Sequence, residues 1–193
     1  MFDFANKLLI ARHLALEEGR ISLFRIPIAI VPVDFESALV KRLFDKVGFD
    51  ETFDILYTEA KRGAIDYCVE LKKNTSAKGH ELANLYAQII TMSGYGKATV
   101  TDFDPLSKKV FCRFDNSPIA TRYIARYGKS KFPLDIITCG FYAGSFNVLF
   151  DADYDAFEVS CIGRGDPFCN FVYGEPKYIQ ELRKVRMEQF LSK

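Results

Sequence analysis

The sequence contains no tryptophan, only two histidines, and almost no excess of charge of either sign. Its 26 basic and 25 acidic residues nearly cancel, and no basic stripe with interleaved aromatic residues is present, which argues against DNA or RNA as a partner. The longest stretch without a charged residue, 136–150, is shorter than the roughly 20 residues of a membrane-spanning helix. The N-terminus lacks the basic and apolar regions of a signal peptide. We therefore expect a cytoplasmic protein with no membrane span and no nucleic-acid partner.

The usual signatures of an enzyme are also missing. His13 and His80 lie far apart in the sequence, and no carboxylate or cysteine pattern around them suggests a catalytic dyad. No Gly-x-Gly-x-x-Gly follows a predicted strand, and the sequence has neither a flavin pattern nor an iron–sulfur run of cysteines. The sequence therefore assigns no catalytic residue.

Length and apolar spacing predict one α+β domain preceded by an extension. The 193 residues are enough for one sizeable core and a little short for two. Residues 1–33 are apolar but poorly periodic, which predicts an N-terminal dimer arm with an edge strand, and residues 34–193 then form the domain. Most of the predicted helices precede most of the predicted strands along the chain. This order is typical of an α+β fold, in which helices pack on an antiparallel sheet. We expect helices at 35–47, 53–71, 82–90, 133–150 and from 176 onward, and strands at 98–103, 109–114, 157–161 and 168–173.

The segment from Glu158 to Cys169 places two cysteines on either side of a Gly/Pro turn. A hairpin centred on Gly165 would set Cys161 opposite Cys169, with Cβ atoms about 4.5 to 5.5 Å apart. That distance suits a shared zinc, a disulfide or two buried free thiols. Glu158 faces away from Cys161 in a regular strand, so it can join the thiols only through a bulge or an early end of the strand.

The number of cysteines is odd, which in a cytoplasmic protein favours thiols or a metal site over a disulfide framework. Cys68 and Cys112 alternate with apolar neighbours and are predicted to fill the core. The full set is Cys68, Cys112, Cys139, Cys161 and Cys169.

The predicted helix at 133–150 contains two glycines one turn apart, Gly140 and Gly144. Each costs up to about 1 kcal/mol in a helix interior relative to alanine, so another interaction must compensate for them. With Ala143 beside them they leave one face without side chains. Either a neighbouring helix packs tightly there, or a flat ligand lies against that face.

Taken together, these segments resemble the 4-vinyl reductase domain family, most closely over residues 95–174. The pattern of that family is an Asn-Ser pair near an alanine, a Gly-Lys-Ser approach to a proline, a Gly-x-x-Ala-Gly helix, and Glu-x-x-Cys-x7-Cys-x-Phe. Here these motifs stand as Asn116-Ser117 with Ala120, Gly128-Lys129-Ser130, Gly140 to Gly144, and Glu158 to Phe171. The resemblance implies an α+β fold, with helices on an antiparallel sheet around an apolar pocket, shared with aromatic-sensing regulator domains and TRAPP subunits.

The resemblance also implies a structural zinc site. Three ligands of the aromatic-sensing relatives correspond to Glu158, Cys161 and Cys169, but their fourth, a cysteine, is replaced by Asp135. Cys139 lies one helical turn later, and either residue could complete a tetrahedron. Asp135 taken alone is expected to cap the helix that follows Pro133.

We therefore expect a stand-alone sensor-type domain that binds a small apolar or aromatic molecule between the glycine-containing helix and the sheet. The face of that helix directed toward the sheet is predicted to supply the pocket residues Tyr142, Phe146 and Leu149. Ligand occupancy would be reported to a downstream protein partner, and the N-terminal arm would form a homodimer. The alternatives are reduction of a vinyl group on a tetrapyrrole-like substrate, as the family name suggests, or a TRAPP-like scaffolding role.

Overall fold

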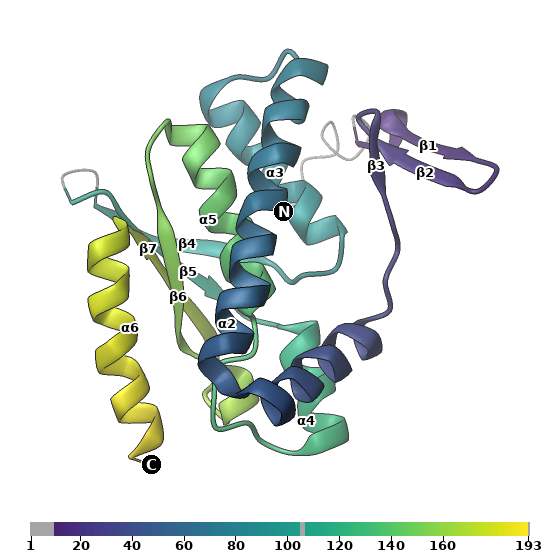
Figure 1. Cartoon of the computed structure of the whole chain (residues 1–193). Helices are drawn as coiled ribbons and strands as arrows, with labels where there is room; N and C mark the ends of the chain where they lie inside the picture. Colours follow the sequence, from purple (N-terminus) through teal and green to yellow (C-terminus); the bar gives the residue numbers. More distant parts are fainter. Residues whose placement is uncertain (1–9, 105–106, 193) are drawn as a thin grey trace.

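The structure, a computed structural model, describes residues 10–104 and 107–192 (Figure 1). The first nine residues of the predicted N-terminal arm, and two residues between the predicted strands at 98–103 and 109–114, lie outside these ranges. Within the described ranges, no helix is both long and apolar enough to cross a lipid bilayer.

The described part of the arm forms a small antiparallel sheet of its own. A tight turn at Phe24 and Arg25, whose φ angles are 52° and 66°, joins its second and third strands. Figure 1 shows this sheet to one side of the body, connected to it by an extended segment. Its strands are β1 (Leu14–Glu17), β2 (Arg20–Leu23) and β3 (Ile26–Ile28).

The range of α2 (Val33–Asn74) holds two helical segments that meet at a kink, as the apolar spacing predicted. The kink lies at Gly48, whose φ of 79° is in the left-handed region that glycine adopts without strain. The Thr52 hydroxyl donates to the Gly48 carbonyl at 2.6 Å and supports the bend. Gly48 therefore separates the two predicted helices, and the second segment follows it directly in a new direction.

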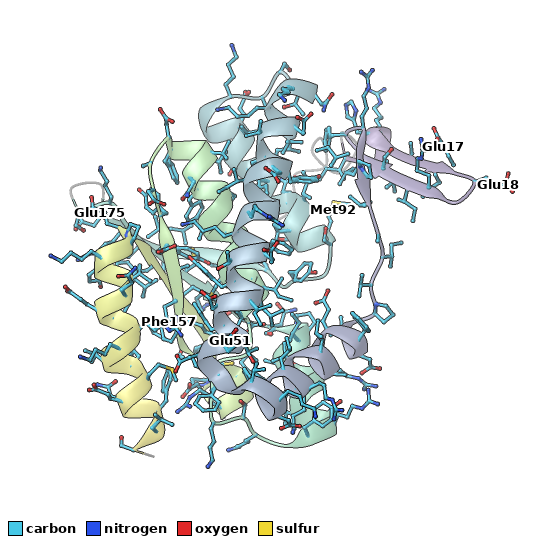
Figure 2. All side chains as sticks on the ribbon, in the orientation of Figure 1. Glu17, Glu18, Glu51, Met92, Phe157 and Glu175 are labelled. Carbon is cyan, nitrogen blue, oxygen red and sulfur yellow. The ribbon has the colours of Figure 1, made fainter. Side chains whose placement is uncertain are left out.

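A second antiparallel sheet carries the main core, in the order β4-β5-β7-β6. Its strands are β4 (Ala98–Asp104), β5 (Lys109–Phe114), β6 (Asp155–Ser160) and β7 (Cys169–Gly174). Helix α5 (Ile136–Phe150) packs on β6 from one side, and α6 (Pro176–Leu191) lies along β6 and β7 on the other (Figure 1). Phe157 of β6 contacts Phe53 of α2 at 5.8 Å between ring centroids (Figure 2). The predicted α+β class is confirmed. These strands and helices, together with α3 (Gly79–Met92), are the remaining predicted elements.

Two details of the helical prediction are wrong. Helix α4 (Pro118–Tyr127) was not predicted, although Pro118 follows a serine that caps it: the Ser117 hydroxyl accepts a hydrogen bond from the Ala120 amide at 3.0 Å. Helix α5 begins at Ile136 and not at Pro133, because the amides of Leu134 and Asp135 donate to a side chain of β6.

The glycines of α5 are explained by helix packing. A Cβ at Gly140 would lie 2.6 Å from the Tyr57 carbonyl oxygen, and one at Gly144 would lie 2.2 Å from the Lys61 carbonyl oxygen. Both distances are far below a van der Waals contact, so α5 and α2 touch backbone to backbone. Of the two interpretations of this face, close helix packing is the one that the structure bears out.

Candidate functional site

The closing hairpin brings together four side chains that can bind a metal. Asp135, Glu158, Cys161 and Cys169 each place one ligand atom within 4.8 Å of the others, and all four residues are buried. Ligands of a tetrahedral zinc are about 3.3 to 3.8 Å apart, given bonds of about 2.0 to 2.3 Å. A small contraction of the cluster would therefore close it around one ion.

The backbone of the hairpin explains how Glu158 reaches this cluster. Glu158 pairs with Phe171 and Ser160 pairs with Asn170, so the register shifts between positions 158 and 160. This irregularity is the bulge that the sequence required, and it turns Glu158 toward the same side as Cys161. After Ser160 the strand ends and the short 3-10 helix η1 (Ile162–Arg164) begins.

Hydrogen bonds orient one oxygen of each carboxylate and leave the other free. Glu158 Oε2 accepts from the amides of Leu134 and Asp135 at 3.1 and 3.0 Å, and the Ser117 hydroxyl donates to Asp135 Oδ1 at 2.6 Å. Glu158 Oε1 and Asp135 Oδ2 are buried and have no hydrogen-bond partner among the described residues. Each carboxylate therefore keeps one oxygen available to a metal, and supporting hydrogen bonds of this kind orient metal ligands in proteins.

Hydrogen bonds also hold the Cys169 thiol and the backbone of Cys161. The amide of Ile162 donates to Cys169 Sγ at 3.3 Å, and the amide of Cys161 donates to Asp166 Oδ2 at 2.9 Å. All five cysteines of the chain are free, so the disulfide considered for Cys161 and Cys169 is not formed. The turn between the two cysteines is thus built around the cluster.

Asp135 does not cap α5 as predicted. It occupies the position before the helix, but its carboxylate accepts the Ser117 hydroxyl in place of an amide of its own helix. Sequence reasoning missed both Ser117 and Asp166 as supports of the cluster. Ser117 could have been found from Ser-Pro, a common helix start, whereas the role of Asp166 depends on the folded turn.

The other three cysteines lie outside this group of four. Cys139 is fully buried, and burial is the main reason that its pKa is raised well above the ordinary value. Burial also raises the pKa values of Cys68 and Cys112 to about 12, so both thiols stay protonated. They fill the core, as their apolar neighbours predicted. Of the two candidates for the fourth ligand, the structure places Asp135 in the group.

The buried carboxyl groups make the site unfavourable without a cation. Burial raises the pKa of Asp135 and raises that of Glu158 well above its ordinary value. Separating an ionised carboxylate from water is costly unless a positive charge compensates for it. The orphaned oxygens and this desolvation both fit a bound divalent cation, and two thiolates with two carboxylates form a ligand set that zinc accepts.

We predict that metal-free protein loses stability as the pH rises. Between the ordinary and the raised pKa of Glu158, the folded protein binds more protons than the unfolded chain, so the free energy of unfolding falls with increasing pH. In chelator, urea unfolding should therefore show lower stability at pH 8 than at pH 5. Metal-loaded protein should show the opposite trend, because the ligands must be deprotonated to bind. Glu158→Gln is the control, and an equally steep pH dependence in that variant would contradict the assignment.

A group of aromatic side chains lies between α5 and the sheet. The ring of Tyr142 lies 5.5 Å from that of Phe114 and 6.1 Å from those of Phe146 and Tyr173, measured between centroids. The hydroxyls of Tyr142 and Tyr173 are buried without a hydrogen-bond partner among the described residues. Leu149 is partly buried on the next turn of α5. Of the three predicted pocket residues, Tyr142 thus carries one of these hydroxyls and Phe146 contacts its ring.

Comparison with known proteins gives structural matches alone, since no protein-family model and no curated protein sequence matches. The phenol-responsive sensory domain of the transcription activator PoxR, solved with phenol, is 17% identical, with a TM-score of 0.80 over 96% of this chain and 98% of that one. A vinyl-4-reductase family protein from Methanocaldococcus jannaschii is 18% identical, with a TM-score of 0.50 over 77% and 83%.

A trafficking protein particle complex subunit 3 from Naegleria fowleri, covalently bound to palmitic acid, is 14% identical, with a TM-score of 0.53 over 74% of this chain and 93% of that one. Together these likenesses establish the fold. The chain has the 4-vinyl reductase and TRAPP-like fold that its sequence motifs implied.

Proposed function

We propose that the chain is a sensor-type domain that binds a small apolar or aromatic molecule between α5 and the sheet. The observation that carries this proposal is the pair of buried hydroxyls of Tyr142 and Tyr173, which have no partner among the described residues. Burial raises both pKa values, so both groups remain hydrogen-bond donors at physiological pH. An unsatisfied buried donor costs about 1 to 3 kcal/mol, and an acceptor group on a bound molecule would recover that energy.

The surroundings of these hydroxyls favour an aromatic ligand. The rings of Phe114, Phe146 and Tyr173 surround Tyr142, and aromatic rings bind other rings through offset or edge-to-face contacts. The ligand proposed here combines an apolar ring with one hydrogen-bond acceptor. The likeness to a phenol-responsive domain supports the same class of ligand. Tyr142, Phe146 and Leu149 are the residues that would contact it.

Zinc, in this proposal, is a structural clip at the end of this core. Asp135, Glu158, Cys161 and Cys169 would provide four ligands, which completes a tetrahedron and leaves no open position for substrate. The ion would fix the hairpin to the segment before α5. The ion would thereby fix the position of α5 relative to the sheet, and these two elements carry the residues of the proposed pocket.

We expect phenol, used as the probe, to raise the melting temperature of the protein in a concentration-dependent way. Tyr142→Phe should weaken phenol binding by roughly 2- to 12-fold, the worth of one neutral hydrogen bond, with little effect on the fold. Tyr178→Phe on α6, away from this group, is the matched control and should bind as the wild type does. Isothermal titration calorimetry measures the affinities.

Ligand binding and a turnover assay together separate the alternatives. Absence of binding to phenol and to larger aromatic compounds would contradict the proposal and favour a scaffold of the TRAPP type. Turnover of a vinyl-substituted tetrapyrrole with added NAD(P)H or flavin would instead establish the reductase alternative, to which the M. jannaschii likeness is relevant.

We also propose that the domain forms a homodimer through its N-terminal sheet and signals to a further protein partner. Leu16 of β1 is 72% exposed and Phe35 at the start of α2 is 60% exposed, which leaves apolar surface for a second copy to cover. Sedimentation at micromolar concentration should give a dimer, and Leu16→Lys should shift it toward monomer without lowering the melting temperature of the body. A monomeric wild type would exclude this interface.

A further inference from the structure

A cavity of about 620 Å³ lies away from the metal cluster, between the N-terminal sheet and helices α2, α3 and α5. Its walls are mostly apolar, and they include Leu23, Ile28, Ile89 and Met92. Figure 2 shows Met92 at the end of α3, on the side that faces β3. The volume is in the range of small-molecule sites in proteins.

One carboxylate interrupts this apolar lining. Glu36 is the sole charged residue among the described residues that line the cavity. The Tyr95 hydroxyl donates to Glu36 Oε1 at 2.7 Å, and burial, the main cause, raises the pKa of Glu36. No basic side chain of the described chain forms a salt bridge with it. A cation in the cavity would therefore compensate for the hydration that the Glu36 carboxylate has lost on burial.

Aromatic rings on the same walls also favour a positive charge. Tyr67, Tyr86, Tyr95 and Phe141 all line the cavity, and Tyr95 meets Phe141 edge to face at 5.2 Å between centroids. The faces of such rings attract ammonium groups. The Tyr67 hydroxyl is buried without a hydrogen-bond partner among the described residues, so it is available to a polar group of a ligand.

From these features we infer that the cavity binds an apolar or aromatic molecule carrying a protonated amine, with the ammonium group at Glu36 and the apolar body against α3 and the N-terminal sheet. This site is separate from the phenol site proposed between α5 and the sheet. It is expected to prefer positively charged ligands, whereas the phenol site is expected to bind a neutral aromatic ring. A single carboxylate in an apolar wall rejects carboxylates and phenolates and selects cations.

Three probes of nearly equal shape test this selectivity: 4-phenylbutylamine, 4-phenylbutan-1-ol and 4-phenylbutanoate. They are positively charged, neutral and negatively charged at pH 7. Calorimetric titration of the full chain should give an affinity for the amine at least about tenfold higher than for the alcohol, and no binding of the acid. Equal affinities for amine and alcohol, or tighter binding of the acid, would overturn the proposal.

Two variants locate the binding. Glu36→Gln keeps an acceptor for the Tyr95 hydroxyl but removes the charge, so amine and alcohol should bind alike. Its control is Glu51→Gln, the same change at an exposed position of α2 away from the cavity (Figure 2), which should retain the preference. If both variants bind the amine as the wild type does, the carboxylate does not recognise it and the proposal is wrong.

Gly63→Leu tests the volume. Gly63 lines the cavity, and a Cβ there would meet no atom within 4 Å, so leucine enters open space on a helix that tolerates it. Amine binding should fall at least about tenfold with an unchanged or higher melting temperature. Tyr142→Phe should leave amine binding unchanged, which separates this site from the phenol site. A Gly63→Leu variant that binds the amine as the wild type does would show that the cavity is not the amine site.

Discussion

Replacing Cys161 with serine is expected to remove the metal and to destabilise the protein by about 4 kcal/mol or more, which for a chain of this size lowers the melting temperature by roughly 8 to 16 °C. The serine hydroxyl is a poor zinc ligand at neutral pH, and losing the ion leaves Asp135 and Glu158 buried with their free oxygens uncompensated. Metal content by plasma mass spectrometry and melting by calorimetry should therefore fall together.

Cys112→Ser is the matched control for this variant. Cys112 is equally buried, but it lies on β5 outside the group of four. It should lose some stability through a buried hydroxyl while keeping the metal content of the wild type. If Cys161→Ser melts like Cys112→Ser and metal content is equal in all three proteins, the hairpin is not held by a metal.

Replacing Gly144 with alanine should cost about 3 kcal/mol or more of unfolding free energy. The added methyl group would lie 2.2 Å from the Lys61 carbonyl oxygen, so α5 and α2 must move apart along their contact. Urea unfolding measures the loss. The effect should far exceed the small gain in helix propensity that alanine brings, about 1 kcal/mol.

Gly63→Ala on α2 is the control, because a Cβ at Gly63 has no neighbour within 4 Å. The same chemical change should there stabilise the protein by up to about 1 kcal/mol. The two alanine substitutions are thus expected to change the free energy of unfolding in opposite directions. If Gly144→Ala is neutral or stabilising, the close contact of the two helices does not exist in solution.

The metal cluster was the most predictable feature, since three of its four residues lie in one short segment, from Glu158 to Cys169. Alternation along a strand showed that Glu158 could join Cys161 only through a bulge, and the register shift between positions 158 and 160 is that irregularity. The glycine pair of α5 predicted a close approach of some kind. The identity of the approaching group, the backbone of α2, depends on a contact between residues about 80 positions apart and could not be derived locally.

Other features depend on long-range contacts that leave a weak trace in the sequence. Helix α5 begins late because Glu158 of β6 binds the amides of Leu134 and Asp135. Asp135 satisfies the general rule for a helix cap, but its carboxylate accepts a hydrogen bond from the Ser117 hydroxyl and none from an amide of α5. The cavity around Glu36 draws its walls from helices and strands that are distant in sequence, so no single segment could indicate it.

X-ray absorption at the zinc edge, on protein purified without chelator, is the most direct test of the hairpin as a structural metal clip. We predict about one zinc per chain, with two sulfur neighbours at about 2.3 Å from Cys161 and Cys169 and two oxygen neighbours at about 2.0 to 2.2 Å from Asp135 and Glu158. Three sulfur neighbours would place Cys139 in the site instead of Asp135. Protein that contains no metal and melts identically in strong chelator would contradict the account.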